Sequence, residues 1–401
     1  MTTIVHAAGA AELLAAIPVL TGFTPRNSLV LLPFRASRTA GALRFDLPGP
    51  PGDDAPTPSV EEFAATAIGL ACRVPDTDAL AIAVYADGVG AGTGSEPPAD
   101  HLPPDPLLPA DHLPAAALPA AELVAELVRR ADACGLRIVE ALHIGADAWT
   151  DYLDPSAPPH PIADVPAAPE VPGFAGPAPD QISGAELPAP GLFAAEKVGR
   201  ALLAVERVLG PAALSRAVPS SAGPVDPQAH GIALALDDLP AFLDEVLDAP
   251  EAQSPFATAA LVWILNRPAL RDVALVQWAR SIDEGDAALA AQLSFGAAGT
   301  AVPESIGETM IGRGPRPDAD RLGVALTLVR RTIALAPRAV RGGPLAAAAW
   351  LAWATGRSTH AAHYLDLLDE VDAELSFGHL LRAIVDAGML PDWAFGKARA
   401  A

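Results

Sequence analysis

Cysteine is scarce in this chain, with only Cys72 and Cys134 among 401 residues. Two cysteines cannot build the disulfide framework that stabilises small secreted domains. Each of the two stands alone near the end of a segment with helical periodicity. Because free cysteine behaves as a small apolar residue, we expect two buried free thiols in a reducing compartment.

Lysine is equally rare. Lys197 and Lys397 are the only two, and 26 basic residues face 48 acidic ones, which gives a formal net charge of −22. Nucleic-acid backbones and anionic membrane surfaces both bind clusters of Lys and Arg, which release counterions or neutralise lipid headgroups. We therefore expect no nucleic-acid partner and no membrane partner, and we interpret the acidic surface as one that keeps the protein soluble.

Long apolar runs are also missing. The uncharged stretches 252–266 and 342–356 are shorter than the roughly 20 residues of a membrane span, so both are predicted to be buried helices. The N-terminus has no basic region, and Glu12 interrupts its apolar part, which argues against a signal peptide. These features together predict a cytoplasmic protein.

The sequence also lacks the common motifs of catalytic and cofactor-binding sites. The sequence contains no G-x-S-x-G elbow, no P-loop and no H-E-x-x-H. The glycine-rich stretch 88–94 does not fit G-x-G-x-x-G, and prolines follow it where a phosphate-binding helix would begin, so a surface loop is the better interpretation. We assign no catalytic residue and expect no cofactor.

The first third of the chain has the pattern of an α/β domain. Segments 28–34 and 79–86 are apolar on both faces, which predicts adjacent central strands, whereas 43–47 alternates between apolar and polar residues. Ser59 and Glu62 have the spacing of a capping box at the start of a helix that runs to about residue 73. A helix over 119–134 and strands over 136–144 and 149–153 complete a domain with a mixed sheet over residues 1–153.

Proline dominates the next segment and helical periodicity the remainder. Residues 154–191 are predicted to be an extended linker or a wrapping arm, because proline donates no backbone hydrogen bond. Residues 192–401 are predicted to form an all-helical domain. Its helices are expected over 193–209, 239–247, 255–265, 270–282, 287–295, 322–335, 345–354, 361–375 and 378–387. The last three resemble tetratricopeptide-type helix pairs without the full signature of that repeat.

Two separate regions resemble one known family. The first includes Gly22, Phe23, Pro25, Ser28, Leu29, Val30, Arg44, Asp46, Leu47 and Pro48, and the second includes 344–356 and 383–393, while the middle of the chain matches poorly. In these regions the sequence resembles an actinobacterial family known only as domain of unknown function 4192. Members of that family often carry a cysteine cluster after a W-x-x-Y element. Here Trp149 and Tyr152 are present without those cysteines, and the resemblance implies a fold but no activity.

Polar residues near the ends of the predicted strands are candidate ligand-binding residues, since ligands of α/β domains bind there. They are Arg26, Asn27, Arg35, Arg44, Asp46 and Asp87. Arg44 and Asp46 share one strand face, and an unpaired buried charge costs several kcal/mol. If helices cover both faces of the sheet, these two residues must bind each other or a ligand; otherwise their face is exposed.

One helix carries a weak metal-binding pattern. His360 and His363, followed by Asp366 and Glu370, recur three or four residues apart. A metal needs further ligands from another element, and His379 is the only other histidine nearby, so we interpret this pattern as a solvated helix face and assign no metal site.

Two functions remain open from the sequence. The first is a non-catalytic interaction or scaffold protein, which binds a protein partner or self-associates through its helices. The second is a small-molecule-binding domain or enzyme that uses the strand-end residues. The helix-pair pattern and the missing catalytic motifs favour the first.

Overall fold

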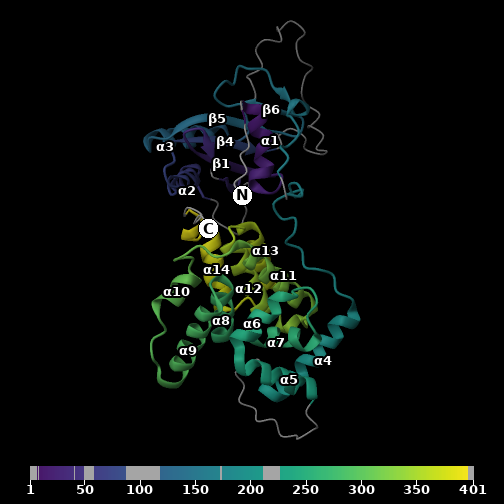
Figure 1. The fold of residues 1–401 in the computed structure, drawn as a ribbon. Coiled ribbons are helices and arrows are strands. Elements are labelled where there is room, and N and C mark those ends of the chain that lie inside the picture. Colours follow the sequence, from purple (N-terminus) through teal and green to yellow (C-terminus); the bar gives the residue numbers. More distant parts are fainter. Residues whose placement is uncertain are drawn as a thin grey trace, which may run out of the picture. The chain divides into compact units, whose positions relative to one another are not determined.

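A computed structural model describes residues 7, 9–39, 41–48, 58–86, 118–171, 174–210 and 226–395 (Figure 1). The chain divides into two units, Met1–Ser183 and Gly184–Ala401. The first contains a mixed sheet with helices and the second is helical, which confirms the predicted fold class.

The sheet of the first unit has the order β2-β1-β4-β5-β6-β7, with β3 also paired to β1. Its central strand pair is β1 with β4, antiparallel and in a register that joins Ser28 to Tyr85. Next to it, β4 and β5 are parallel. The predicted adjacency of the two most apolar strands is therefore confirmed. The strands are β1 Ser28–Arg35, β2 Arg38–Thr39, β3 Leu43–Asp46, β4 Ala79–Tyr85, β5 Arg137–Ile144, β6 Ala148–Asp151 and β7 His160–Pro161.

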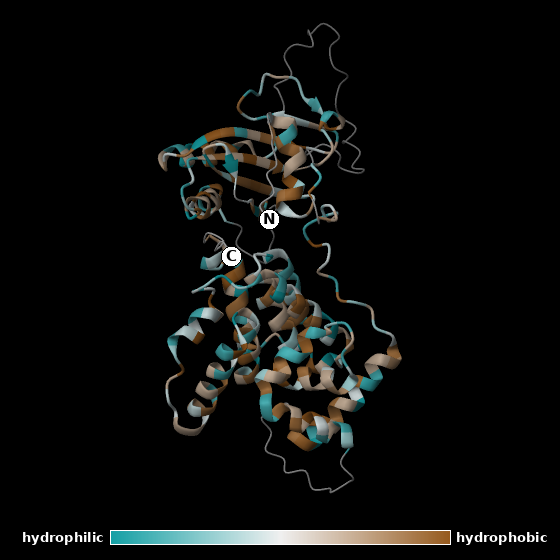
Figure 2. Cartoon of the chain, viewed as in Figure 1, coloured by the Kyte–Doolittle hydropathy of each residue, from teal (hydrophilic) through white to brown (hydrophobic). Residues whose placement is uncertain are grey.

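Helices cover both faces of this sheet. Helix α1 (Ala10–Thr21) packs Leu13, Leu14 and Ile17 on the face that carries Val30 and Leu32. Helices α2 (Val60–Cys72) and α3 (Ala121–Ala133) cover the opposite face. The alternation of side chains along β1 divides its apolar residues between these two cores, which explains why β1 is apolar throughout. Figure 2 shows the predominantly apolar colouring of the central strands.

The proline-rich segment stays with the first unit as far as Ser183. Its strand β7 pairs with β6, and Ala178 forms a parallel bridge with Phe23. The sequence predicted a linker or a wrapping arm from residue 154, whereas the division between the units falls between Ser183 and Gly184. Over 154–183 the described residues therefore form an arm that lies against the sheet unit.

The second unit is a helical assembly with aromatic residues at its centre. Trp278, Trp350 and Tyr364 are fully buried, and every residue of α12 (Gly342–Ala354) is buried. The expectation of buried helices over 252–266 and 342–356 is confirmed. No helix in the described part of the chain is long and apolar enough to cross a membrane. The other helices are α4 Leu192–Leu209, α5 Pro227–Ala235, α6 Leu239–Asp248, α7 Pro255–Leu265, α8 Pro268–Ala279, α9 Ile282–Ala298, α10 Glu304–Met310, α11 Ala319–Leu335, α13 Ser358–Asp372 and α14 Ser376–Asp386.

Candidate functional site

One edge of the sheet gathers most of the polar residues that the sequence singled out. The first residue of β1, Ser28, pairs with the last residue of β3, Asp46, and with the last residue of β4, Tyr85. Arg26 and Arg44 therefore lie at the same edge, which we call the polar edge. Asp87, another candidate from the sequence, lies outside the residues that the structure describes.

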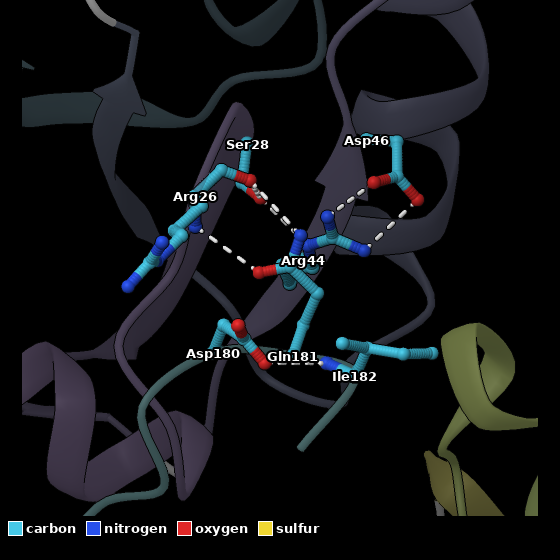
Figure 3. Close-up of polar contacts among 7 residues, drawn as sticks. All are labelled: Arg26, Ser28, Arg44, Asp46, Asp180, Gln181 and Ile182. Carbon is cyan, nitrogen blue, oxygen red and sulfur yellow. Dashed lines mark hydrogen bonds and ion pairs between the residues drawn. The ribbon is translucent and has the colours of Figure 1, made fainter. Parts of the chain in front are cut away.

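The Arg44 guanidinium is occupied by contacts within the protein (Figure 3). Its Nε donates to Ser28 Oγ at 2.8 Å and its Nη1 donates to Asp46 Oδ2 at 2.9 Å, while Nη2 contacts the other carboxylate oxygen of Asp46. The Arg44 side chain is only 8% exposed, and that of Asp46 is 68% exposed. Of the arrangements that the sequence left open, the structure shows the pair between these two residues.

Gln181 ties the proline-rich arm to the polar edge. Its Oε1 accepts from the Arg26 backbone N–H at 3.2 Å, and its Nε2 donates to the Arg26 carbonyl oxygen at 3.1 Å. The same carbonyl accepts a hydrogen bond of 2.6 Å from Ser28 Oγ. The side-chain amide therefore contacts the backbone as a neighbouring strand would.

Asp180 stabilises the turn that presents Gln181. Its Oδ1 accepts from the Ser183 hydroxyl at 2.6 Å and from the backbone N–H groups of Ile182 and Ser183 at 3.2 and 2.9 Å. These bonds, the Ser183 hydroxyl first, and the nearby charge of Arg26 lower the pKa of the Asp180 carboxyl. Figure 3 shows the exposed Arg26 guanidinium directed away from Arg44.

Of the two other described candidates, Arg35 lies apart from the polar edge and Asn27 lies at it. Arg35 ends β1 at the opposite edge of the sheet, where it forms a 2.9 Å ion pair with Asp76. Asn27 is exposed and has φ of 44°, a left-handed conformation that asparagine tolerates better than most residues, so it serves the turn into β1. The structure places Arg26, Asn27, Arg44 and Asp46 at one edge and leaves Arg35 apart.

The two carboxylates of the histidine pattern bind different arginines, because Asp366 pairs with Arg382 and Glu370 lies 3.7 Å from Arg338. His360 is buried, and Asp366 binds Arg382 at 2.8 Å. The described residues contain no group of three or more His, Cys, Asp or Glu side chains that could hold a metal ion.

Sequence reasoning missed the contribution of the arm to the polar edge. Gln181 lies 155 residues from its partner Arg26, and a single amide in a proline-rich segment leaves no periodic signal. It also missed His143, a buried histidine of β5 whose Nε2 lies 2.9 Å from the Ala86 carbonyl oxygen. The polar edge, as described, holds backbone segments together, and ligand binding there stays a prediction.

A different surface stands out in the helical unit. Helix α9 has 17 residues, of which only Gly285 and Ala288 are buried. Its second half carries no charge, and Leu293 and Phe295 are 64% and 55% exposed. We call residues 289–298 the α9 surface. Figure 1 shows α9 and α10 at one side of the helical unit.

Comparison with known protein families gives one match. The model of the family described as Domain of unknown function (DUF4192) matches residues 11–392. The chain belongs to this family. The resemblance seen at both ends of the sequence is confirmed, and the DUF4192 match also includes the middle of the chain, so it contains both the polar edge and the α9 surface. Searches of the curated proteins and of the solved structures found no match.

Proposed function

We propose that this protein is a non-catalytic interaction protein, and that the α9 surface binds an apolar patch on a partner protein. The observation that supports it is the burial of α9, because a 17-residue helix normally covers an apolar stripe, and this one buries two small residues. Exposed apolar side chains grouped on one element are typical of interaction sites.

The charge pattern of α9 indicates what kind of partner fits. Asp283, Glu284 and Asp286 lie in its first turns, and the following residues are uncharged as far as Pro303. A complementary partner therefore presents an apolar patch with basic residues beside the N-terminal end of α9. The net charge of −22 argues against nucleic acid as that partner, and two free cysteines fit a cytoplasmic location.

Two substitutions of the same residue type test the proposal. Leu293→Asp places a charge in the α9 surface, and Leu203→Asp places one on α4 at a leucine with nearly the same exposure, 63%. We expect the wild type and Leu203→Asp to retain the same partner in affinity capture from the source lysate, and Leu293→Asp to lose it at least tenfold. A partner is then expressed alone and its affinity measured by calorimetry.

Three outcomes would contradict the proposal. One is that the tagged wild type retains no protein above background, and a second is that Leu293→Asp retains its partner as well as the wild type does. The third is that Leu203→Asp weakens capture as much as Leu293→Asp, since the effect would then be one of added charge. Light scattering on the purified wild type separates self-association from binding to another protein.

A further inference from the structure

The two cysteines of the chain meet on the surface of the sheet unit. Cys72 ends α2 and Cys134 follows the last residue of α3, and 61 residues separate them in the sequence. Both are exposed and free, which corrects the expectation that the thiols are buried and isolated. The two helices that carry them pack against each other, and the Cys72 thiol is close enough to Cys134 for the two groups to interact electrostatically.

The topology explains why these two residues meet. Helix α3 connects the parallel strands β4 and β5, and α2 leads into β4 from β3, which has the same direction as β4. Both helices therefore run opposite to β4, and they pack beside each other on one face of the sheet (Figure 1). Their C-terminal ends lie where β4 and β5 begin, and the first residues of those strands, Ala79 and Arg137, are paired.

We propose that Cys72 and Cys134 form a reversible disulfide, which makes this surface a two-electron oxidation site for a peroxide. The inference is independent of the proposed function, since it uses none of the residues of the α9 surface.

The chemistry balances with hydrogen peroxide as the oxidant. One thiol releases its proton and the resulting thiolate attacks the peroxide; the O–O bond breaks, and the departing hydroxide takes up that proton, so that a sulfenic acid and one water form. The sulfur of the second cysteine then attacks the sulfenic sulfur, the S–O bond breaks, and the hydroxyl group leaves with the thiol proton as a second water. The two thiols lose two electrons and two protons in total. A dithiol reductant reverses the reaction by thiol–disulfide exchange.

The environment of the pair suits a resolving reaction. Partial burial, and after it the interaction with Cys134, raise the pKa of the Cys72 thiol. Oxidation beyond the sulfenic acid competes with disulfide formation, and a second thiol at the end of the neighbouring helix favours the disulfide. The bond would join the ends of α2 and α3 and enclose β4, which restricts the unfolded chain.

To test the proposal, the purified chain is oxidised with a small excess of hydrogen peroxide. We expect the intact mass to fall by two hydrogens, the thiols that react with a maleimide to fall from two per chain to none, and dithiothreitol to restore both. Peptide mapping without reduction should give one species in which the peptides of Cys72 and Cys134 are linked. The apparent melting temperature should rise by roughly 5 to 15 °C in the oxidised form.

Cys72→Ser and Cys134→Ser serve as matched controls at exposed positions. Neither should show the internal loss of two hydrogens or the rise in melting temperature. The proposal is overturned if the wild type gains oxygen atoms instead of losing hydrogens, if its linked peptides come from two chains, or if both thiols still react after oxidation. Peptide mapping of the wild type decides the matter even if a variant does not fold.

Discussion

Arg44 and Arg35 show how burial decides the value of an ion pair. Each contacts one aspartate within the same sheet, but the Arg35 side chain is 66% exposed and its partner Asp76 is 49% exposed. Water screens that pair and competes for both groups, so its contribution to stability is small. The Arg44 side chain is 8% exposed, and three of its nitrogens are engaged with Ser28 and Asp46. The hydrogen bonds of the Arg44 guanidinium therefore replace those that it makes with water in the unfolded chain, and losing them costs stability.

Substitution of each arginine should distinguish the contribution of the buried Arg44 pair from that of the exposed Arg35 pair. We expect Arg44→Ala to lower the free energy of unfolding of the sheet unit by about 1 to 3 kcal/mol, because the variant loses charge-assisted hydrogen bonds at a buried position. Arg35→Ala should change it by less than about 0.5 kcal/mol. Urea unfolding followed by circular dichroism measures both. Equal effects would mean that the Arg44 pair is as well solvated as the Arg35 pair.

At the residue scale, the sequence indicated one of the polar pairs of the sheet unit and missed two contacts between residues that are distant in the sequence. The alternation of 43–47 placed Arg44 and Asp46 on one strand face, and the structure pairs them. The contact between Cys72 and Cys134 depends on the packing of two helices, and that of Arg26 with Gln181 on the path of the arm. Both depend on tertiary structure, and no local pattern encodes them.

At the scale of elements, the close approach of α12 to α7 rests on one glycine. A Cβ at Gly343 would lie 2.2 Å from the Leu265 carbonyl oxygen, and the Gly343 N–H donates to the side chain of Asn266 at 3.1 Å. The obstacle is backbone, so a rotamer change cannot relieve the clash. The first turn of α12 therefore lies against the end of α7 only because residue 343 has no side chain.

A pair of glycine substitutions tests this contact. Gly343→Ala should destabilise the helical unit by about 2 kcal/mol or more, because α12 must move away from α7. Gly323→Ala in α11 is the matched control: a Cβ there meets nothing within 4 Å, so alanine should be neutral or stabilise by up to about 1 kcal/mol. Thermal unfolding monitored at 222 nm compares the two. A neutral Gly343→Ala would show that α12 tolerates the displacement.

The sequence predicted the helices whose apolar periodicity is strong, and it missed helices that are too short to show that periodicity. The predicted range 255–265 coincides with α7, whereas α5 and α10 were not predicted. Helix α5 has nine residues, and its signal is at its start, where Asp226 caps the backbone and Pro227 follows. Attention to the cap as well as to periodicity would have found it. Helix α9 extends beyond its predicted 287–295 because Ser281 caps it earlier.

At the scale of the whole molecule, the hydrophobic cores follow the division into units. The two clusters on the faces of the sheet contain only residues of the first unit, and the cluster around Val205 and Val262 contains only residues of the second. The sequence predicted the two fold classes, because the apolar period changes between them. For 154–191 it predicted a linker or a wrapping arm, because proline content alone does not distinguish the two; the contacts of Ala178 and β7 with the sheet unit depend on tertiary structure.

Separate cores predict separate unfolding. Differential scanning calorimetry of the full chain should resolve two transitions, and Gly343→Ala should move only one of them, since its contacts lie in the helical unit. Arg44→Ala should move only the other. One transition whose van't Hoff and calorimetric enthalpies agree would contradict this expectation, as would two transitions that shift together in either variant.

The complete burial of α12 also bears on how distant relatives can be found. Because every residue of this helix is buried, a change of side-chain volume at any of its positions disturbs the packing around it. We therefore expect this stretch to accept fewer substitutions than the exposed helices of the chain. Searches for remote homologues, and alignments that must bridge divergent loops, should therefore be anchored on Gly342–Ala354.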